Sequence, residues 1–335
     1  MCCTGGVIES GELPDALDAV VEQSLLGGPR RYTRSQVAEI SGVPIERARK
    51  LWVALGFPAA GNDDEAAFTD ADIAAVRAFT NMSEVAGTSE QSQIAAARTL
   101  GQAMARLAEW QADLITHDIG PRVAGAGGRP EEATARTIAV LTELQEYAWQ
   151  RHLAAALSRS VESGGATRQL LVGFADMVGY TRLSRHLDLT ELTELLDGFE
   201  AATTEAITGN GGWVIKNVGD EVMFAAENAR DGARIALAMH AAIAVAAQSI
   251  PDMPQIRIGL AYGPVLTRFG DLYGTVVNVA ARLTGVARPG TILLDDGAAA
   301  ALGEDHDYTV RHLRSVRVKG FSRLRPHVLR EPKRR

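Results

Sequence analysis

Residues 170–181 read LLVGFADMVGYT, and they decide the fold of the second half of the chain. The apolar run 170–175 has the length of a buried β-strand, and it ends on an acid, Asp176. Gly179 follows closely and opens a helix. Asp176 can be a metal ligand beside backbone N–H groups that face a phosphate, or it can simply cap the helix.

A second stretch, residues 213–225, reads WVIKNVGDEVMFA and predicts a β-hairpin. Its strands, 213–217 and 221–225, flank a tight turn, which alone explains Gly219 and Asp220. Lys216 is harder to explain in this way, because it is a polar residue in an otherwise apolar strand. If the strands of Asp176 and Asp220 are neighbours, the two carboxylates can hold two Mg²⁺ or Mn²⁺ ions.

A third stretch, residues 270–282, reads GDLYGTVVNVAAR. It begins with a loop that carries Asp271 and continues as a helix. Asn278 and Arg282 are four residues apart and therefore share one face of this helix. An ordinary solvated helix face is the alternative explanation for these two polar residues.

Strands and helices alternate throughout the second half of the chain. Asp188 and Glu191 form a capping box that begins a helix. Further helices are expected over 231–248 and 275–286, two strands within 255–267 around Gly263-Pro264, and later strands near 292, 310, 316 and 328. This alternation predicts an α/β or α+β sandwich.

The first half has the periodicity of helices. They are expected over 15–26, 33–57 with a turn at 42–44, 70–79, 91–114 and 131–160, with a loop at Gly120-Pro121 and over 125–129. Ser163-Gly164-Gly165 ends the last helix. We place the domain boundary there, which gives an all-α domain over 1–165 and a second domain over 166–335.

Residues 35–57 look like a helix-turn-helix, and basic residues lie on or near its second helix. They are Arg30, Arg31, Arg34, Arg47, Arg49 and Lys50. DNA binding is one hypothesis for this segment. A helical scaffold is the favoured alternative, because the surrounding domain is acidic.

Composition limits the class of protein. The 335 residues carry a net charge of −7, although the last 25 contain ten Lys/Arg against one acid, so general attraction to nucleic acid or anionic lipid is not expected. Cys2 and Cys3 are the only cysteines, which excludes a disulfide framework and a cysteine zinc site. We see no signal peptide and no membrane span, and expect a soluble, cytoplasmic protein.

The three stretches FADMVGYT, KNVGDEVMF and GDLYGTVVNVAAR together resemble the class III nucleotidyl cyclases, in order and in spacing. The resemblance covers roughly residues 169–330 and implies a ferredoxin-like α+β catalytic domain. It implies that Asp176 and Asp220 bind the metals and that Lys216 and Asp271 select the base. By the same resemblance, Asn278 and Arg282 stabilise the transition state. Lys319 resembles a triphosphate-contacting lysine, or is one more residue of the basic tail.

The resemblance further implies an adenylate cyclase, which converts ATP to 3′,5′-cyclic AMP and pyrophosphate with two Mg²⁺ or Mn²⁺ ions. The family works as a homodimer: one protomer supplies the metal acids and its partner supplies the other four residues. Hydrogen-bond chemistry favours ATP over GTP. Lys216 only donates and ionised Asp271 only accepts, which matches N1 and N6 of adenine and mismatches guanine.

The arrangement of a helical domain before a cyclase domain is similar to actinobacterial adenylate cyclases with an N-terminal regulatory domain. We expect the helix 131–160 to transmit a small-molecule or pH signal, and His117 and His152 are candidates for titration near neutral pH. Exposed histidines without such a role are the alternative. Two other functions stay open: a nucleotide-sensing DNA-binding regulator, and an inactive cyclase-like interaction module.

Overall fold

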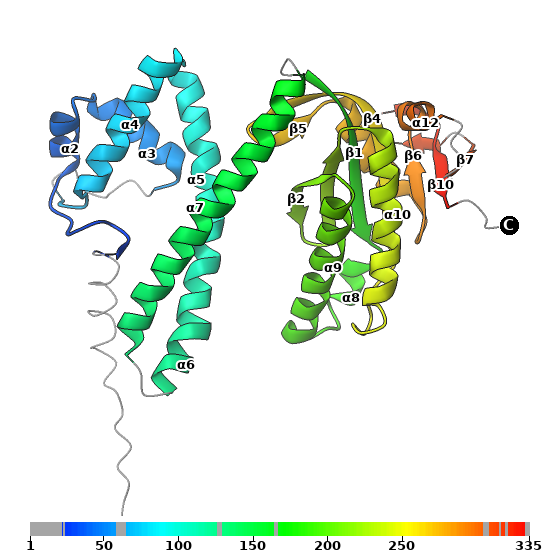
Figure 1. Ribbon diagram of the computed structural model, residues 1–335, viewed down its shortest axis with the longest axis horizontal. Coiled ribbons are helices and arrows are strands. Elements are labelled where there is room, and N and C mark those ends of the chain that lie inside the picture. The colour runs from blue at the N-terminus through cyan, green and yellow to red at the C-terminus, as the bar shows by residue number, and fades with distance from the viewer. Residues whose placement is uncertain are drawn as a thin grey trace, which may run out of the picture. The chain divides into compact units, whose positions relative to one another are not determined.

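A computed structural model describes residues 22, 24–57, 65–125, 129–163, 167–303, 308–314, 316–318 and 321–331 (Figure 1). The chain divides into two compact units, Met1–Arg159 and Ser160–Arg335. The two units are described separately below.

The first unit is helical. Its elements are α2 (Arg34–Ser41), α3 (Ile45–Leu55), α4 (Asp70–Ala86), α5 (Glu90–Asp113), the π-helix η1 (Leu114–Ile119), α6 (Gly120–Gly125) and α7 (Pro130–Ser163). Thr33 forms a capping box at the start of α2, and Gly42 ends that helix in the left-handed conformation. The predicted turn between α2 and α3 is therefore confirmed. Trp52 of α3 stacks on Phe68 with ring centroids 4.6 Å apart and anchors the small core.

One prediction for this unit was wrong. Gly120-Pro121 was expected to form a loop, but α5 continues through η1 into α6 across these residues. A proline inside a helix removes one backbone hydrogen bond and disturbs the preceding turn. Here the turn before Pro121 is the π-helix η1, in which the N–H of Gly120 bonds to the carbonyl of Ile115, and such wider turns are where helices accommodate this disturbance.

The second unit is built on the sequence of elements β1 (Thr167–Met177), α8 (Tyr180–Leu183), α9 (Leu189–Gly209), β2 (Trp213–Val218), β3 (Glu221–Ala226), α10 (Ala229–Ala246) and β4 (Ile256–Arg268). The strands lie in the order β2-β3-β1-β4, and all neighbouring pairs are antiparallel. Leaving aside the short α8, this is the β-α-β-β-α-β arrangement of ferredoxin-like folds. The predicted fold class is confirmed.

The rest of the unit extends this sheet. It comprises β5 (Asp271–Tyr273), α11 (Thr275–Val286), β6 (Ile292–Leu294), α12 (Asp296–Leu302), β7 (Thr309–His312), β8 (Val316–Val318), β9 (Phe321–Leu324) and β10 (His327–Arg330). Strand β5 pairs with β4, β6 lies parallel to β4, and β10 and β7 follow at the edge. The expected break at Gly263-Pro264 is absent: β4 is one strand, because its pairing with β1 continues through Leu170↔Gly263 and Gln169↔Pro264.

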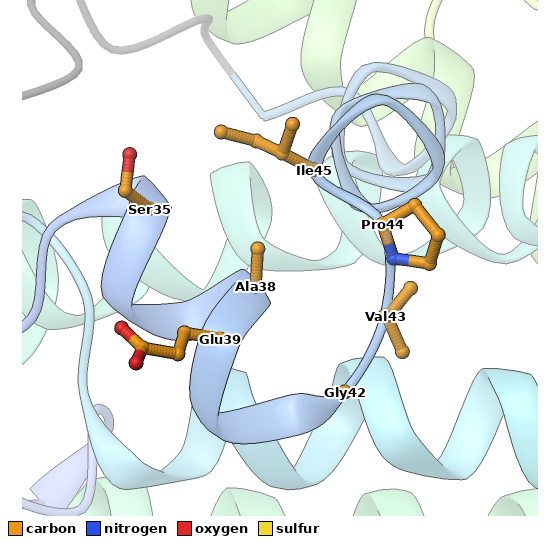
Figure 2. Close-up of a pocket in the computed structure, with 7 residues that line it drawn as sticks. All are labelled: Ser35, Ala38, Glu39, Gly42, Val43, Pro44 and Ile45. Carbon is orange, nitrogen blue, oxygen red and sulfur yellow. The ribbon is translucent and has the colours of Figure 1, made fainter.

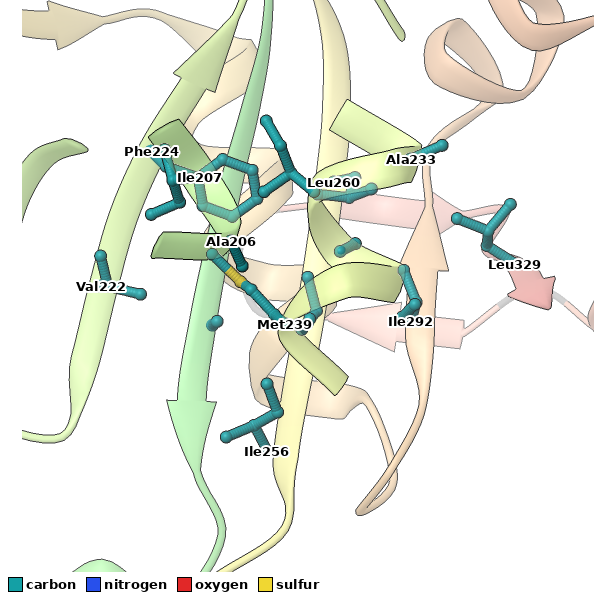
Figure 3. Packing of buried hydrophobic residues seen from close by; sticks show 14 of the residues in the cluster. Ala206, Ile207, Val222, Phe224, Ala233, Met239, Ile256, Leu260, Ile292 and Leu329 are labelled. Carbon is teal, nitrogen blue, oxygen red and sulfur yellow. The ribbon is translucent and has the colours of Figure 1, made fainter. Parts of the chain in front are cut away.

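The sheet has a core on each face. Helices α9 and α10 cover one face, where Phe224, Met239 and Leu260 pack (Figure 3). Helix α11 covers the other face, over Leu170, Val172 and Phe174. Successive side chains of a strand point to opposite faces, so Asp176 continues the row that points to the α11 face. The alternation of β1 therefore decides on which side of the sheet the acid lies.

Candidate functional site

Asp176 is the centre of a polar row that crosses three strands. Its register partners are Glu221 on β3 and Arg257 on β4, and register partners point to the same face of a sheet. The Asp176 side chain is nearly buried, with 11% exposed, and its Oδ2 accepts a 2.5 Å hydrogen bond from Nε of Arg257. Arg257 also donates from Nη1 to the carbonyl of Gly285 at 3.3 Å, which links the row to α11.

Asp220 lies beside this row, in the turn that leads into β3, the strand next to β1. It follows Gly219, which takes the left-handed conformation in the β2–β3 turn, and its carbonyl accepts from the N–H of Met177 at 3.0 Å. Burial raises the pKa of the Asp220 carboxyl, and the negative charge of Asp176 adds to this. Burial, Asp176 and Asp220 likewise raise the pKa of Glu221. Three acids thus crowd a place where a cation would relieve their repulsion.

The donor chemistry of this place fits a hard divalent cation. Carboxylate oxygens are the ligands that Mg²⁺ and Mn²⁺ prefer. In the described part of the chain, no group of three or more His, Cys, Asp or Glu residues has an arrangement that could hold a metal ion. Mg²⁺ is usually held by one or two carboxylates together with substrate phosphates and water. Asp176 and Asp220 therefore fit an ion that arrives with a phosphate ligand.

Lys216 and Asp271 are joined directly, although 54 residues separate them in the sequence. Nζ of Lys216 on β2 lies 2.6 Å from Oδ2 of Asp271 on β5. Oδ1 of Asp271 accepts the backbone N–H of Leu272 at 2.8 Å, which fixes the carboxylate. Both side chains remain partly exposed, 43% for Lys216 and 30% for Asp271, so a ligand can reach them.

Asn278 and Arg282 lie together on the exposed face of α11, while Val279 and Leu283 of the same helix are buried. The described contacts join Asp176 to Arg257 and Lys216 to Asp271, but they join neither pair to Asn278 or Arg282. Of the predicted site residues, Lys216 and Asp271 are thus in direct contact with each other, and Asn278 and Arg282 share the exposed face of one helix. Lys319 lies outside the described residues.

Two residues of this region were not predicted from the sequence. Arg257 is the charged residue in the apolar run 256–261, and Glu221 follows Asp220 directly. The sequence marks both as polar residues at strand positions. Only the register of β3, β1 and β4 shows that they face Asp176.

The helix-turn-helix-like segment has a shallow hollow of about 550 Å³ between α2 and α3, lined by Ser35, Glu39 and Ile45 among others (Figure 2). Its basic residues are mostly engaged within the unit. Arg31 pairs with Asp70, Lys50 pairs with Glu90 at 3.1 Å, and Arg47 donates to Gln93 at 2.9 Å. Arg34 is buried. The acids Asp70 and Glu90 thus offset the charges of Arg31 and Lys50, two of the six basic residues on which the DNA hypothesis depends.

Comparison with known proteins identifies the class of protein to which the chain belongs. Residues 165–331 match the adenylate and guanylate cyclase catalytic domain. A protein of Streptomyces coelicolor named adenylate cyclase is 39% identical over 306 residues, which cover 89% of this chain and 78% of that protein. An adenylate cyclase of Glutamicibacter nicotianae is 34% identical and is covered to 81%. The structure of the adenylyl cyclase CyaB from P. aeruginosa aligns with 50% of this chain, with 26% identity and a TM-score of 0.45.

The second unit therefore carries the catalytic domain of a nucleotidyl cyclase, and the expectation of an enzyme is confirmed. The chain belongs to the class III adenylate cyclase family. Among the described residues, no helix has the length and apolar character needed to cross a membrane.

Proposed function

We propose that this protein is an adenylate cyclase that converts ATP to 3′,5′-cyclic AMP and pyrophosphate. The observation that carries the choice of base is the contact between Lys216 and Asp271. The ammonium group of Lys216 can only donate hydrogen bonds, and the carboxylate of Asp271 can only accept them. N1 of adenine accepts and its N6 donates, whereas guanine offers the reverse at both positions. Each unpaired polar group would cost about 1–3 kcal/mol, which favours ATP strongly over GTP.

Asp176 and Asp220 would hold two Mg²⁺ or Mn²⁺ ions. Bound there, the ions would make the ribose 3′-OH more acidic and neutralise charge on the pyrophosphate. Nε of Arg257 donates to Oδ2 of Asp176, so Oδ1 is the oxygen that we assign to an ion. Arg257 thereby fixes the orientation of the carboxylate from the strand that lies opposite.

The remaining steps belong to α11. Arg282 would donate to the oxygens of the α-phosphoryl group as charge grows on them, an interaction that contributes roughly 3–4 kcal/mol when its donors are preorganised. Asn278 would hold the ribose so that the hydroxyl attacks in line with the leaving pyrophosphate. A homodimer in which Asn278 and Arg282 act from the partner of the protomer that holds the metal is part of this proposal, and it rests on the resemblance to the family.

The first experiment measures both cyclic nucleotides after incubation of the purified protein with ATP or GTP and Mn²⁺ or Mg²⁺. Asp176→Ala is the control for contaminating cyclases. Cyclic AMP from the parent and none from the variant is the expected result. Comparable cyclic GMP from GTP would refute the choice of base.

A complementation experiment tests the composite site. The Asp176→Ala and Arg282→Ala variants should each be inactive alone. When they are mixed and their protomers exchange, the heterodimers that form have one intact site. Roughly a quarter of the parental activity should return, because half of the dimers are mixed and each has one working site of two. If the mixture stays inactive although exchange is verified, the site lies within one chain.

The first unit is proposed to be regulatory, with α7 connecting it to the catalytic unit. His117 on η1 and His152 on α7 are both exposed, and they are the candidate residues for a pH signal. An unchanged pH–activity profile of the His117/His152 double substitution would end the pH hypothesis. A comparison of residues 166–335 with the full chain would show whether the first unit inhibits or activates.

A further inference from the structure

Arg257 and a divalent ion would bind the same carboxylate. Nε of Arg257 lies 2.5 Å from Oδ2 of Asp176, the acid to which the proposed function assigns the ions. Hydrogen bonds between ionised partners are among the stronger ones in proteins. Arg257 therefore already supplies a positive charge at the place where the ion would supply one.

The guanidinium group of Arg257 is held from two sides. Besides its contact with Asp176, it donates from Nη1 to the carbonyl of Gly285 on α11 at 3.3 Å. Ile256 and Ile258, its neighbours on β4, are buried and anchor the backbone. The planar guanidinium loses little freedom for each hydrogen bond that it forms. The contact with Asp176 is thus a defined part of the metal-free protein.

The charge of Arg257 acts on all three acids of the polar row. Burial raises the pKa of Asp220 and of Glu221, and the positive charge of Arg257 opposes this rise in both. The Arg257 side chain is only 33% exposed, and charges that are partly shielded from water are screened less than those at the surface. A cation that enters between these acids is therefore attracted by the carboxylates and repelled by Arg257.

We propose that Arg257 is a built-in competitor of the divalent ion, which keeps the affinity of Asp176 and Asp220 for a free ion low. The inference rests on the proposed function, in which these two acids hold the ions. A nucleoside triphosphate brings negative charge of its own, so an ion that arrives with it meets a smaller net repulsion. Protein sites commonly hold Mg²⁺ by one or two carboxylates together with the phosphates of the substrate. Arg257 thereby favours entry of the ion with its nucleotide over entry of the ion alone.

Binding of Mn²⁺ alone to the full chain tests the proposal. Free Mn²⁺ has an electron paramagnetic resonance signal that is lost on binding, so a titration without nucleotide gives the dissociation constant. Arg257→Gln keeps a hydrogen-bond donor near Asp176 and removes the positive charge. We expect this variant to bind Mn²⁺ at least about fivefold more tightly than the parent, because the repulsion between the two cations is gone. A loss of structural support alone would weaken binding instead.

Two further variants locate the effect. Arg311→Gln makes the same change of charge at an exposed position of β7, three strands away from β4 in the sheet. Three strand spacings are about 14 Å, more than the Debye length of about 10 Å at 0.1 M salt, so this control should keep the parental affinity. The double variant Arg257→Gln/Asp176→Ala should lose the tight binding, because Asp176 is the ligand that the substitution of Arg257 releases.

Thermal unfolding with and without Mn²⁺ gives a second readout, which also serves if Arg257→Gln is less stable than the parent. An ion that binds only the folded state raises the midpoint of unfolding, and tighter binding raises it further. Mn²⁺ should therefore raise the midpoint of Arg257→Gln by more than it raises that of the parent. Equal shifts in the two proteins would contradict the competition.

The outcomes separate this inference from the proposed function when cyclic AMP formation is measured on the same samples. Suppose that the parent is active but Arg257→Gln binds Mn²⁺ no more tightly than the parent or than Arg311→Gln. The competition is then refuted and the cyclase stands. Tight binding that survives Asp176→Ala also refutes it, because the ion then lies elsewhere. A parent that forms no cyclic AMP, together with no Mn²⁺ bound to it or to Arg257→Gln, would overturn both.

Discussion

Arg257 and Asp176 face each other on neighbouring strands, and Nε of the arginine lies 2.5 Å from Oδ2 of the acid. The side chains are 33% and 11% exposed, so the pair is shielded from water on most sides. Removal of one partner from such a pair leaves the other charge without compensation, which costs more than the pair itself contributes.

Arg257→Ala should therefore lower the free energy of unfolding by about 1–3 kcal/mol in metal-free protein. Urea unfolding in the presence of a chelator measures this. In an Asp176→Asn background the same arginine substitution should cost clearly less, because no charge is left to compensate. Equal losses in both backgrounds would mean that the contact contributes nothing to stability.

Asp271→Asn tests the choice of base. An asparagine at this position can turn its NH₂ group towards the N6 donor of adenine, so the acceptor is no longer guaranteed. We expect kcat/KM for ATP to fall about 5- to 150-fold, the equivalent of about 1–3 kcal/mol. The ratio of ATP to GTP activity should fall as well. Asp197→Asn, the same substitution at an exposed position of α9, is the control and should keep the parental ratio.

His240 on α10 gives a prediction for pH. Burial lowers the pKa of this histidine, and its Nε2 is buried without a hydrogen-bond partner among the described residues. On acidification, the unfolded chain binds this proton at a higher pH than the folded protein does. The contribution of neutral His240 to stability is therefore complete above the ordinary pKa of about 6.5, and it is lost as the pH falls from there towards the lower pKa of the folded state. His240→Gln should remove this acid-dependent loss.

The measurement compares the free energy of unfolding at about pH 7.5 and about pH 5.5, on either side of the ordinary histidine pKa. His152→Gln, a substitution at an exposed histidine, should leave the difference unchanged. If His240→Gln loses as much stability on acidification as the parent, protonation of His240 is not responsible.

Local patterns in the sequence predicted what depends on local structure. The strand that ends at Asp176, the hairpin turn at Asp220 and the helix of Asn278 and Arg282 were each visible in a dozen residues, and the structure has them where they were expected. Arg257 escaped because its role depends on which residue of β4 lies opposite Asp176, and no local pattern contains that register.

The errors have the same origin. Gly263-Pro264 is a break when read locally, but eleven paired positions with β1 keep β4 continuous across it. Gly120-Pro121 likewise suggests a loop, yet the preceding helix carries on through it. The family resemblance named Lys216 and Asp271 as the pair that selects the base, and their direct contact came only from the structure. Neither residue alone would have pointed to the other.

Gly259→Ala should disturb the site from a distance. A Cβ at Gly259 on β4 would lie 2.3 Å from the backbone N of Thr284 and 2.4 Å from the carbonyl O of Ala280, both on α11. These are backbone atoms, so the helix that carries Asn278 and Arg282 would have to move off the sheet. We expect a loss of about 1–3 kcal/mol in unfolding free energy and a fall in kcat.

Gly285→Ala on α11 is the control. A Cβ at Gly285 meets nothing within 4 Å, and alanine is a better helix former than glycine, so this variant should be more stable by up to about 1 kcal/mol. If both variants keep parental stability and kcat, close packing of α11 on β4 is not what positions Asn278 and Arg282.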